Sequence, residues 1–211
     1  MRAEVINLLR EGEKPSPAAT VSAGITAVVL AGQRDARFGQ IDKALISVGG
    51  RALIKRVLEQ LVMQVRQIVV VAGANSWLYA SQGCRVIPHE NTHPLSAIAA
   101  GLAVIDTTHA LVVPGDAPRL PHDLASGLWQ VQNERQLPCY VRASDRAIPE
   151  CALIAKSERA SIEQAFNAGR TLADWLTSRQ AVQVDYSDWP AEFWGLRDAT
   201  DVRALETKLR R

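Results

Sequence analysis

The sequence predicts an α/β fold with a mainly parallel central sheet and helices on both of its faces. Short apolar runs alternate with segments of helical periodicity along most of the chain. The runs VVLA at 28–31 and QIVVVA at 67–72 are almost continuously apolar, as expected for strands covered on both faces. A hydrophobic content of 47% with 22% charged residues is that of a globular protein.

The predicted elements follow from the spacing of apolar residues along the chain. Short apolar runs predict strands at 28–31, 67–72, 84–87, 110–113, near 140, near 152, and at 182–184. Apolar residues at helical spacing predict helices at 52–63, 76–81, 94–105, 124–132, 161–166, 171–178 and 201–209. Pro94 supports a helix start, because proline is favoured in the first helical turn.

The length of 211 residues suits one sizeable domain, which we expect to span 25–211. Residues 1–24 contain two prolines and many small residues, and we expect a flexible N-terminal extension there. Within it, residues 5–9 have the pattern of one or two helical turns.

Composition excludes several classes of protein. A net charge of +2 without a basic block argues against nucleic-acid binding. No run of about 18 apolar residues is present, so we expect no membrane span, and the N-terminus lacks the apolar core of a signal peptide. The cysteines form no C-x-x-C pair, which fits reduced thiols and a cytoplasmic location: Cys84, Cys139 and Cys151.

A glycine-punctuated basic loop follows the first predicted strand. Backbone N–H groups at Gly32 and Gly39 could surround phosphate oxygens, since glycine places no Cβ in the way. Arg34, Arg37 and Lys43 add cationic donors suited to a triphosphate. The loop matches neither a Walker loop nor the dinucleotide fingerprint. The alternative is an ordinary connection whose arginines are solvated.

Asp116 follows the predicted strand 110–113 within the turn PGDAP. A carboxylate held there suits a Mg²⁺ ion that also contacts substrate phosphates. The alternative is a turn in which Asp116 accepts a nearby backbone N–H. Because ligands of parallel sheets bind at the carboxyl ends of the strands, we expect Asp116 and the basic loop at one edge.

Several segments resemble the molybdenum cofactor guanylyltransferases, which are MobA-like nucleotidyltransferases. Residues 30–39 (LAGQRDARFG) and 42–45 (DKAL) are similar to the family signature LAGGxxxRMGxxDKxL. Residues 50–54 (GRALI) resemble the GKPLI that follows it, and 74–75 resemble the family's A-N pair. Residues 113–118 (VPGDAP) resemble an apolar strand that ends in C-D-x-P.

The resemblance covers about residues 25–205 and implies a three-layer, Rossmann-like nucleotidyltransferase of the nucleotide-diphospho-sugar transferase type. It implies Mg²⁺-dependent transfer of GMP from GTP to molybdopterin, with release of pyrophosphate, alongside other proteins of the molybdenum cofactor pathway. Two alternatives stay open. One is a nucleotidyltransferase for another base or acceptor, such as a molybdopterin cytidylyltransferase. The other is an inactive, regulatory relative that binds nucleotide.

The resemblance also implies roles for individual residues. Arg37 and Lys43 would hold the triphosphate and stabilise the leaving pyrophosphate, and Asp116 would bind the Mg²⁺ ion. The implied catalytic residues are therefore these three. The implied nucleotide-binding residues are Leu30, Ala31, Gly32, Gln33, Arg34, Lys43, Asn75, Glu90 and Asp116.

Four segments depart from the family pattern. Gln33 replaces a glycine, and His89-Glu90 stands where the family has the acidic residue that reads guanine. Glu90 could accept both hydrogen bonds of the guanine edge after a shift of one residue. Residues 93–97 (HPLSA) replace GPLAG, and 195–201 replace a segment NxNTPED. These changes leave Lys43 and Asp116 in place but weaken the expected recognition of base and acceptor.

Overall fold

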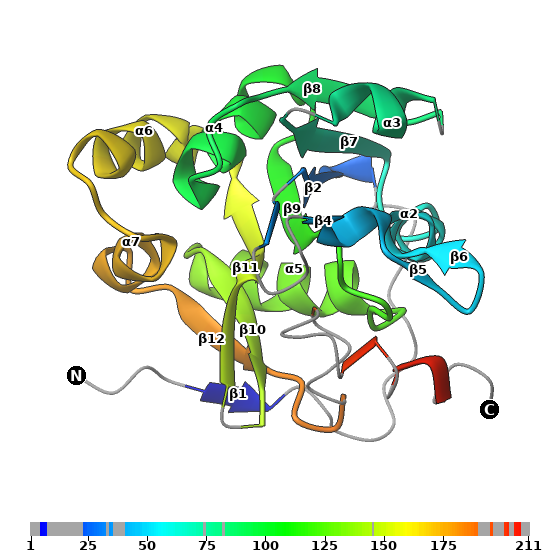
Figure 1. Ribbon diagram of the computed structural model, residues 1–211. Helices are drawn as coiled ribbons and strands as arrows, with labels where there is room; N and C mark the ends of the chain where they lie inside the picture. Colours follow the sequence, from blue (N-terminus) through cyan, green and yellow to red (C-terminus); the bar gives the residue numbers. More distant parts are fainter. Residues whose placement is uncertain are drawn as a thin grey trace.

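An eight-stranded sheet forms the centre of the computed structural model, with the strand order β1-β12-β10-β11-β9-β2-β7-β8 (Figure 1). The structure describes residues 5–7, 23–32, 34–35, 41–73, 75–81, 83–144, 146–189, 195, 201–202 and 205–207, with the backbone alone at 5–7 and 34–35. The strands of the sheet are β1 (Val5–Asn7), β2 (Ile25–Leu30), β7 (Gln67–Ala72), β8 (Arg85–Pro88), β9 (His109–Pro114), β10 (Cys139–Ala143), β11 (Arg146–Ala155) and β12 (Val182–Asp185).

Two small hairpins lie beside the sheet, and helices connect the strands. The hairpins pair β3 (Arg34–Asp35) with β4 (Ile41–Asp42), and β5 (Ser47–Val48) with β6 (Arg51–Ala52). The helices are α2 (Leu53–Leu61), α3 (Ser76–Ala80), α4 (Pro94–Val104), α5 (Leu124–Arg135), α6 (Arg159–Asn167) and α7 (Leu172–Ser178), with 3-10 turns η2 (Lys43–Leu45) and η3 (Lys156–Glu158). In the part of the chain that is described, no helix combines the length and the apolar character that a membrane crossing requires.

The predicted mainly parallel sheet is confirmed. Strand β11 is antiparallel to both of its neighbours, β9 and β10, whereas the other neighbouring strands of this sheet run parallel. β11 is also longer than predicted, and its register with β10 shifts between Tyr140 and Val141. Pro149 lies in this irregular stretch, where its lack of an N–H group is tolerated.

The N-terminal segment differs from expectation. Residues 5–9 have a helical pattern, but Val5–Asn7 form β1, parallel to β12 at one end of the sheet. Backbone pairing with an otherwise open strand edge outweighs the weak local preference for helix. The expected domain start at residue 25 stays a prediction. The predicted helix at 201–209 is helical at 201–202 and 205–207, and its remaining residues lie outside the described ones.

Helices cover both faces of the sheet, which confirms the three-layer arrangement. Successive side chains of a strand point to opposite faces. Val29 of β2 packs with Ile54 of α2 and with α5 in one buried cluster. Val28 packs with Ile98 of α4, and with α6 and α7, in a second cluster on the other face.

Close packing places helix α4 directly over β2. Gly101 of α4 contacts the sheet where a Cβ atom would lie 2.5 Å from Val28 Cγ1. Glycine therefore allows the helix backbone to approach the strand. Because α4 follows the carboxyl end of the parallel strand β8, its N-terminal end at Pro94 lies at the carboxyl edge of the sheet.

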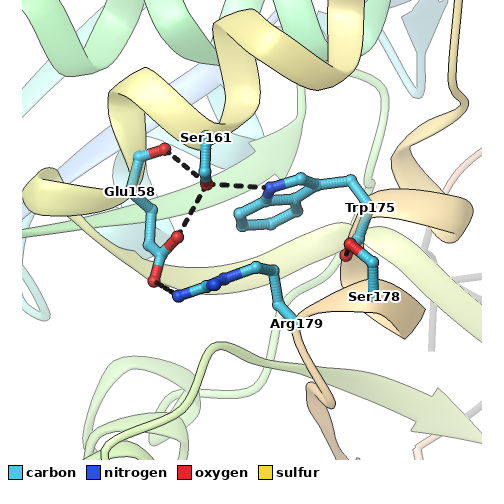
Figure 2. A network of polar contacts seen from close by, with 5 residues as sticks. All are labelled: Glu158, Ser161, Trp175, Ser178 and Arg179. Carbon is cyan, nitrogen blue, oxygen red and sulfur yellow. Dashed lines mark hydrogen bonds and ion pairs between the residues drawn. The ribbon is translucent and has the colours of Figure 1, made fainter. Parts of the chain in front are cut away.

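A polar network joins α6 and α7 (Figure 2). The indole Nε1 of the buried Trp175 donates to Ser161 Oγ at 3.1 Å. Ser161 Oγ lies 2.8 Å from Glu158 Oε2, and Arg179 donates to the other oxygen of that carboxylate at 2.6 Å. Ser178 Oγ donates to the Trp175 carbonyl at 2.7 Å.

Removing the acceptor of the Trp175 indole should destabilise the fold. We expect Ser161→Ala to lower the free energy of unfolding by about 1–3 kcal/mol, because a buried donor loses its partner. Urea denaturation measures the change. Ser81→Ala is the matched control, since the exposed Ser81 hydroxyl donates to the carbonyl of Leu78. Equal losses for the two variants would contradict this role for Ser161.

Candidate active site

A cavity of about 170 Å³ opens at the carboxyl ends of β2 and β9. Its walls come from the ends of these strands, from Asp42, Lys43 and Ala44 around η2, from Pro94 and from β11. Asp116 and Gly195 also line it, and the backbone of Gly195 lies close enough that a Cβ there would be 3.5 Å from both carboxylate oxygens of Asp116. Polar groups from distant parts of the chain thus meet at this edge.

Lys43 and Asp116 meet in this cavity, as their positions after parallel strands predict. The Lys43 Nζ atom lies 3.2 Å from Asp116 Oδ2. The two side chains are 21% and 12% exposed, so the ion pair is partly shielded from water. Charges interact more strongly in such surroundings than on an open surface. The cavity therefore holds a cation and a carboxylate in direct contact.

The residues at the end of β2 lie where the sequence places them. Leu30 and Ala31 line the cavity. Gly32 follows with φ of +79°, and a Cβ there would lie 2.7 Å from the backbone nitrogen of Gly73. This position accepts glycine alone without rearrangement. Arg34 pairs through its backbone with Asp42.

Two of the expected catalytic and nucleotide-binding residues lie outside the described part of the chain. They are Gln33 and Arg37, and the side chain of Arg34 is likewise not described. The roles of these three residues stay predictions.

A narrow hollow adjoins the cavity and shares Leu30 and Ala31 with it. His89 lines this hollow and its Nε2 lies 2.9 Å from Ser96 Oγ on α4. Glu90 is exposed and does not line the hollow. His89 therefore lies at the hollow next to Gly32, and the nucleotide-binding role expected for Glu90 stays a prediction.

Two residues of the site that were not predicted from the sequence, Asp42 and Tyr79, bond to each other beside the basic loop. Asp42 is 4% exposed, and its Oδ2 accepts from the hydroxyl of the buried Tyr79 at 2.7 Å. The amide of Asn75, expected at the nucleotide, donates to the same oxygen at 3.3 Å. A signal for Asp42 was its position next to Lys43. None pointed to Tyr79, which fits the apolar pattern of a helix.

One wall of the cavity, formed by β11, was not predicted from the sequence. Arg146, Ile148 and Glu150 of β11 line it, as alternate residues of a strand do when one face points to a site. Among the described residues, neither Arg146 nor Glu150 has a hydrogen bond or an ion pair with another side chain. No motif marks these residues in the sequence.

Comparison with known proteins shows which family shares this architecture. A model of the MobA-like NTP transferase domain matches residues 27–184. A protein of Yersinia pestis (strain Pestoides F) named molybdenum cofactor guanylyltransferase is 35% identical over 190 residues. The match covers 88% of this chain and 97% of that relative.

Solved structures show the same fold. One is molybdopterin-guanine dinucleotide biosynthesis protein A from Archaeoglobus fulgidus, with a TM-score of 0.72, 20% identity, and 88% and 98% of the two chains covered. Another comes from Mycobacterium tuberculosis H37Rv in complex with manganese, with a TM-score of 0.67, 14% identity, and 88% and 99% covered. At such low identities these structures show the fold alone.

Proposed function

This chain belongs to the MobA-like NTP transferase family, and we propose that it transfers GMP from GTP to molybdopterin, which yields a guanine dinucleotide cofactor and pyrophosphate. The observation that carries the proposal is the contact of Lys43 with Asp116 in a cavity at the carboxyl edge of the sheet. A cationic side chain and a carboxylate are the groups that a triphosphate and its metal ion require.

The chemistry matches these residues. A phosphate oxygen of the acceptor attacks the α-phosphorus of GTP, and the bond from that phosphorus to the bridging oxygen of pyrophosphate breaks. Both reactants are anions, so catalysis consists mainly of positioning and charge neutralisation. Lys43 would leave its ion pair with Asp116 and bind triphosphate oxygens, where its charge stabilises the leaving group.

The residues present fit a divalent metal ion, and we propose Mg²⁺. Within the described residues no group of three His, Cys, Asp or Glu side chains could hold a metal ion. Mg²⁺ commonly binds through one or two carboxylates together with substrate phosphates and water. Asp116 would be the protein ligand. When bound there, the ion supplies positive charge beside the reacting phosphates.

Helix α4 adds to the positive potential of the cavity. Pro94, at its first turn, lines the cavity, and the backbone dipoles of the eleven residues Pro94–Val104 point their positive end there. Anions bind favourably at such helix starts.

The three cysteines are unpaired, which is compatible with a reaction in the cytoplasm.

A second candidate is transfer from a nucleotide other than GTP. The guanine edge needs a group that accepts two hydrogen bonds, which a carboxylate provides. The hollow beside Gly32 holds His89 in the place of a carboxylate. Among the described residues that line this hollow none is a carboxylate, which leaves transfer from a nucleotide with another base, such as CTP, as the alternative.

Release of pyrophosphate with molybdopterin and Mg²⁺ tests the proposal across GTP, CTP, ATP and UTP. We expect release with GTP that depends on the acceptor, and rates close to background with the other three. Faster release with CTP would instead support a cytidylyltransferase. Binding of GTP without any release would support the regulatory relative and contradict the proposed function.

A further inference from the structure

Hydrogen bonds tie both ends of the segment 33–41 to one short helix. The backbone N–H of Gly32 donates to the hydroxyl of Tyr79 at 3.3 Å, and this hydroxyl donates to Asp42 Oδ2 at 2.7 Å. Asn75 donates to the same oxygen at 3.3 Å. We call these four residues, Gly32, Asp42, Asn75 and Tyr79, the Asp42 clasp. It joins Gly32, which precedes the segment 33–41, to Asp42, which follows it.

The two residues at the centre of the clasp, Asp42 and Tyr79, are buried. Tyr79 has no exposed surface, and Asp42 is 4% exposed. Burial, and next the negative charge of Asp42, raise the pKa of Tyr79 well above its ordinary value, so that the hydroxyl stays protonated and donates. A buried carboxylate is costly unless donors surround it. Hydrogen bonds to an ionised group are stronger than those between neutral groups, and three of them hold Asp42 in one position.

The clasp connects directly to Lys43. Asp42 Oδ1 accepts from the backbone N–H of Ala44 at 3.2 Å and thereby caps the turn η2. Lys43 is the first residue of that turn, and its ammonium group reaches Asp116. One carboxylate thus holds Tyr79 with one oxygen and the turn that carries Lys43 with the other.

We propose that Tyr79 is a positioning residue, which acts through Asp42 to hold Lys43 where it meets the triphosphate. The partly buried Asn75 donates to the same carboxylate and helps to hold it in place. The proposal rests on the proposed function for the identity of the nucleotide. Tyr79 itself is not in the wall of the cavity, whereas Asp42 and Lys43 are.

Titration of the protein with Mg²⁺–GTP, in the absence of acceptor, tests this role. Tyr79→Phe removes one hydroxyl and keeps the buried ring, and we expect it to raise the Kd about ten-fold, as loss of a hydrogen bond to a charged group does. Tyr140→Phe is the matched control, because the Tyr140 hydroxyl accepts from Gln183 at 2.7 Å on β10 and β12, away from the cavity. We expect that variant to bind as the wild type does.

If Tyr79 only stabilised the fold, the effect of Tyr79→Phe on the Kd would be the same with and without the Lys43 ammonium group. In a Lys43→Met background, we therefore expect Tyr79→Phe to change the Kd by less than about two-fold, since coupled residues are not additive. Equal ten-fold losses in both backgrounds, or no loss in the wild-type background, would overturn the proposal.

The outcome is separable from that of the proposed function. Binding is measured without acceptor. A wild-type protein that binds GTP but transfers nothing would contradict the proposed function, yet the Kd values of the wild type and of Tyr79→Phe could still be compared. Mg²⁺–CTP gives the same comparison if the base preference differs, because Lys43 would contact phosphates and not the base.

Discussion

Asp116→Asn is expected to lower the rate of pyrophosphate release about 100- to 1000-fold, the effect of removing one preorganised charge from a reacting centre. The amide has nearly the shape of the carboxylate but no charge, so it binds a divalent cation poorly. It also removes the carboxylate that lies 3.2 Å from Lys43. The measurement is pyrophosphate release with saturating GTP, acceptor and Mg²⁺.

Asp106→Asn is the control for this prediction. Asp106 is an exposed carboxylate that lines a different cavity with His109, at the opposite end of β9. We expect its variant to retain the wild-type rate. A rate for Asp116→Asn within a few-fold of the wild type would show that Asp116 does not bind the metal ion of the reaction.

Lys43→Met is expected to weaken binding of Mg²⁺–GTP by about 10- to 100-fold, since hydrogen bonds to charged groups contribute about 1.5–3 kcal/mol. Methionine keeps much of the apolar stem and loses the ammonium group. Arg34→Ala should weaken binding less. Calorimetric titration compares the variants, and the melting temperature reports whether the fold is retained.

Lys156→Met is the control for loss of a lysine. Its ammonium group donates to the carbonyl of Ile105 at 2.5 Å, beside the cavity that also contains Asp106. We expect its variant to bind GTP as the wild type does. Equal losses for Lys43→Met and Arg34→Ala would contradict the assignment of the triphosphate to Lys43.

The sequence located the strands that carry the site and the edge at which it lies. β2, β7 and β9 are almost continuously apolar, and such runs are recognisable because both faces of a parallel sheet are covered. The rule that ligands bind at the carboxyl ends of parallel strands then predicted that Lys43 and Asp116 share one edge. Their ion pair confirms this prediction.

β11 shows where local pattern fails. Its first half contains Pro149 and Glu150, residue types that are depleted in strands, yet residues 146–148 pair with β10, and Arg146, Ile148 and Glu150 line the cavity. Tertiary pairing overrode the local preference. The wall of the site that contains Arg146 and Glu150 was therefore not predicted.

The sequence by itself determined the layered α/β fold, the carboxyl-edge site and the two charged residues at its centre, because apolar periodicity and the alternation of strands and helices can be read along the chain. The tertiary structure decided which polar groups meet. Tyr79 bonds to Asp42 across 37 residues, and His89 lines the hollow next to Leu30 and Ala31. Such contacts depend on how strands and helices pack side by side, and no spacing within the sequence encodes the distance between side chains of different elements.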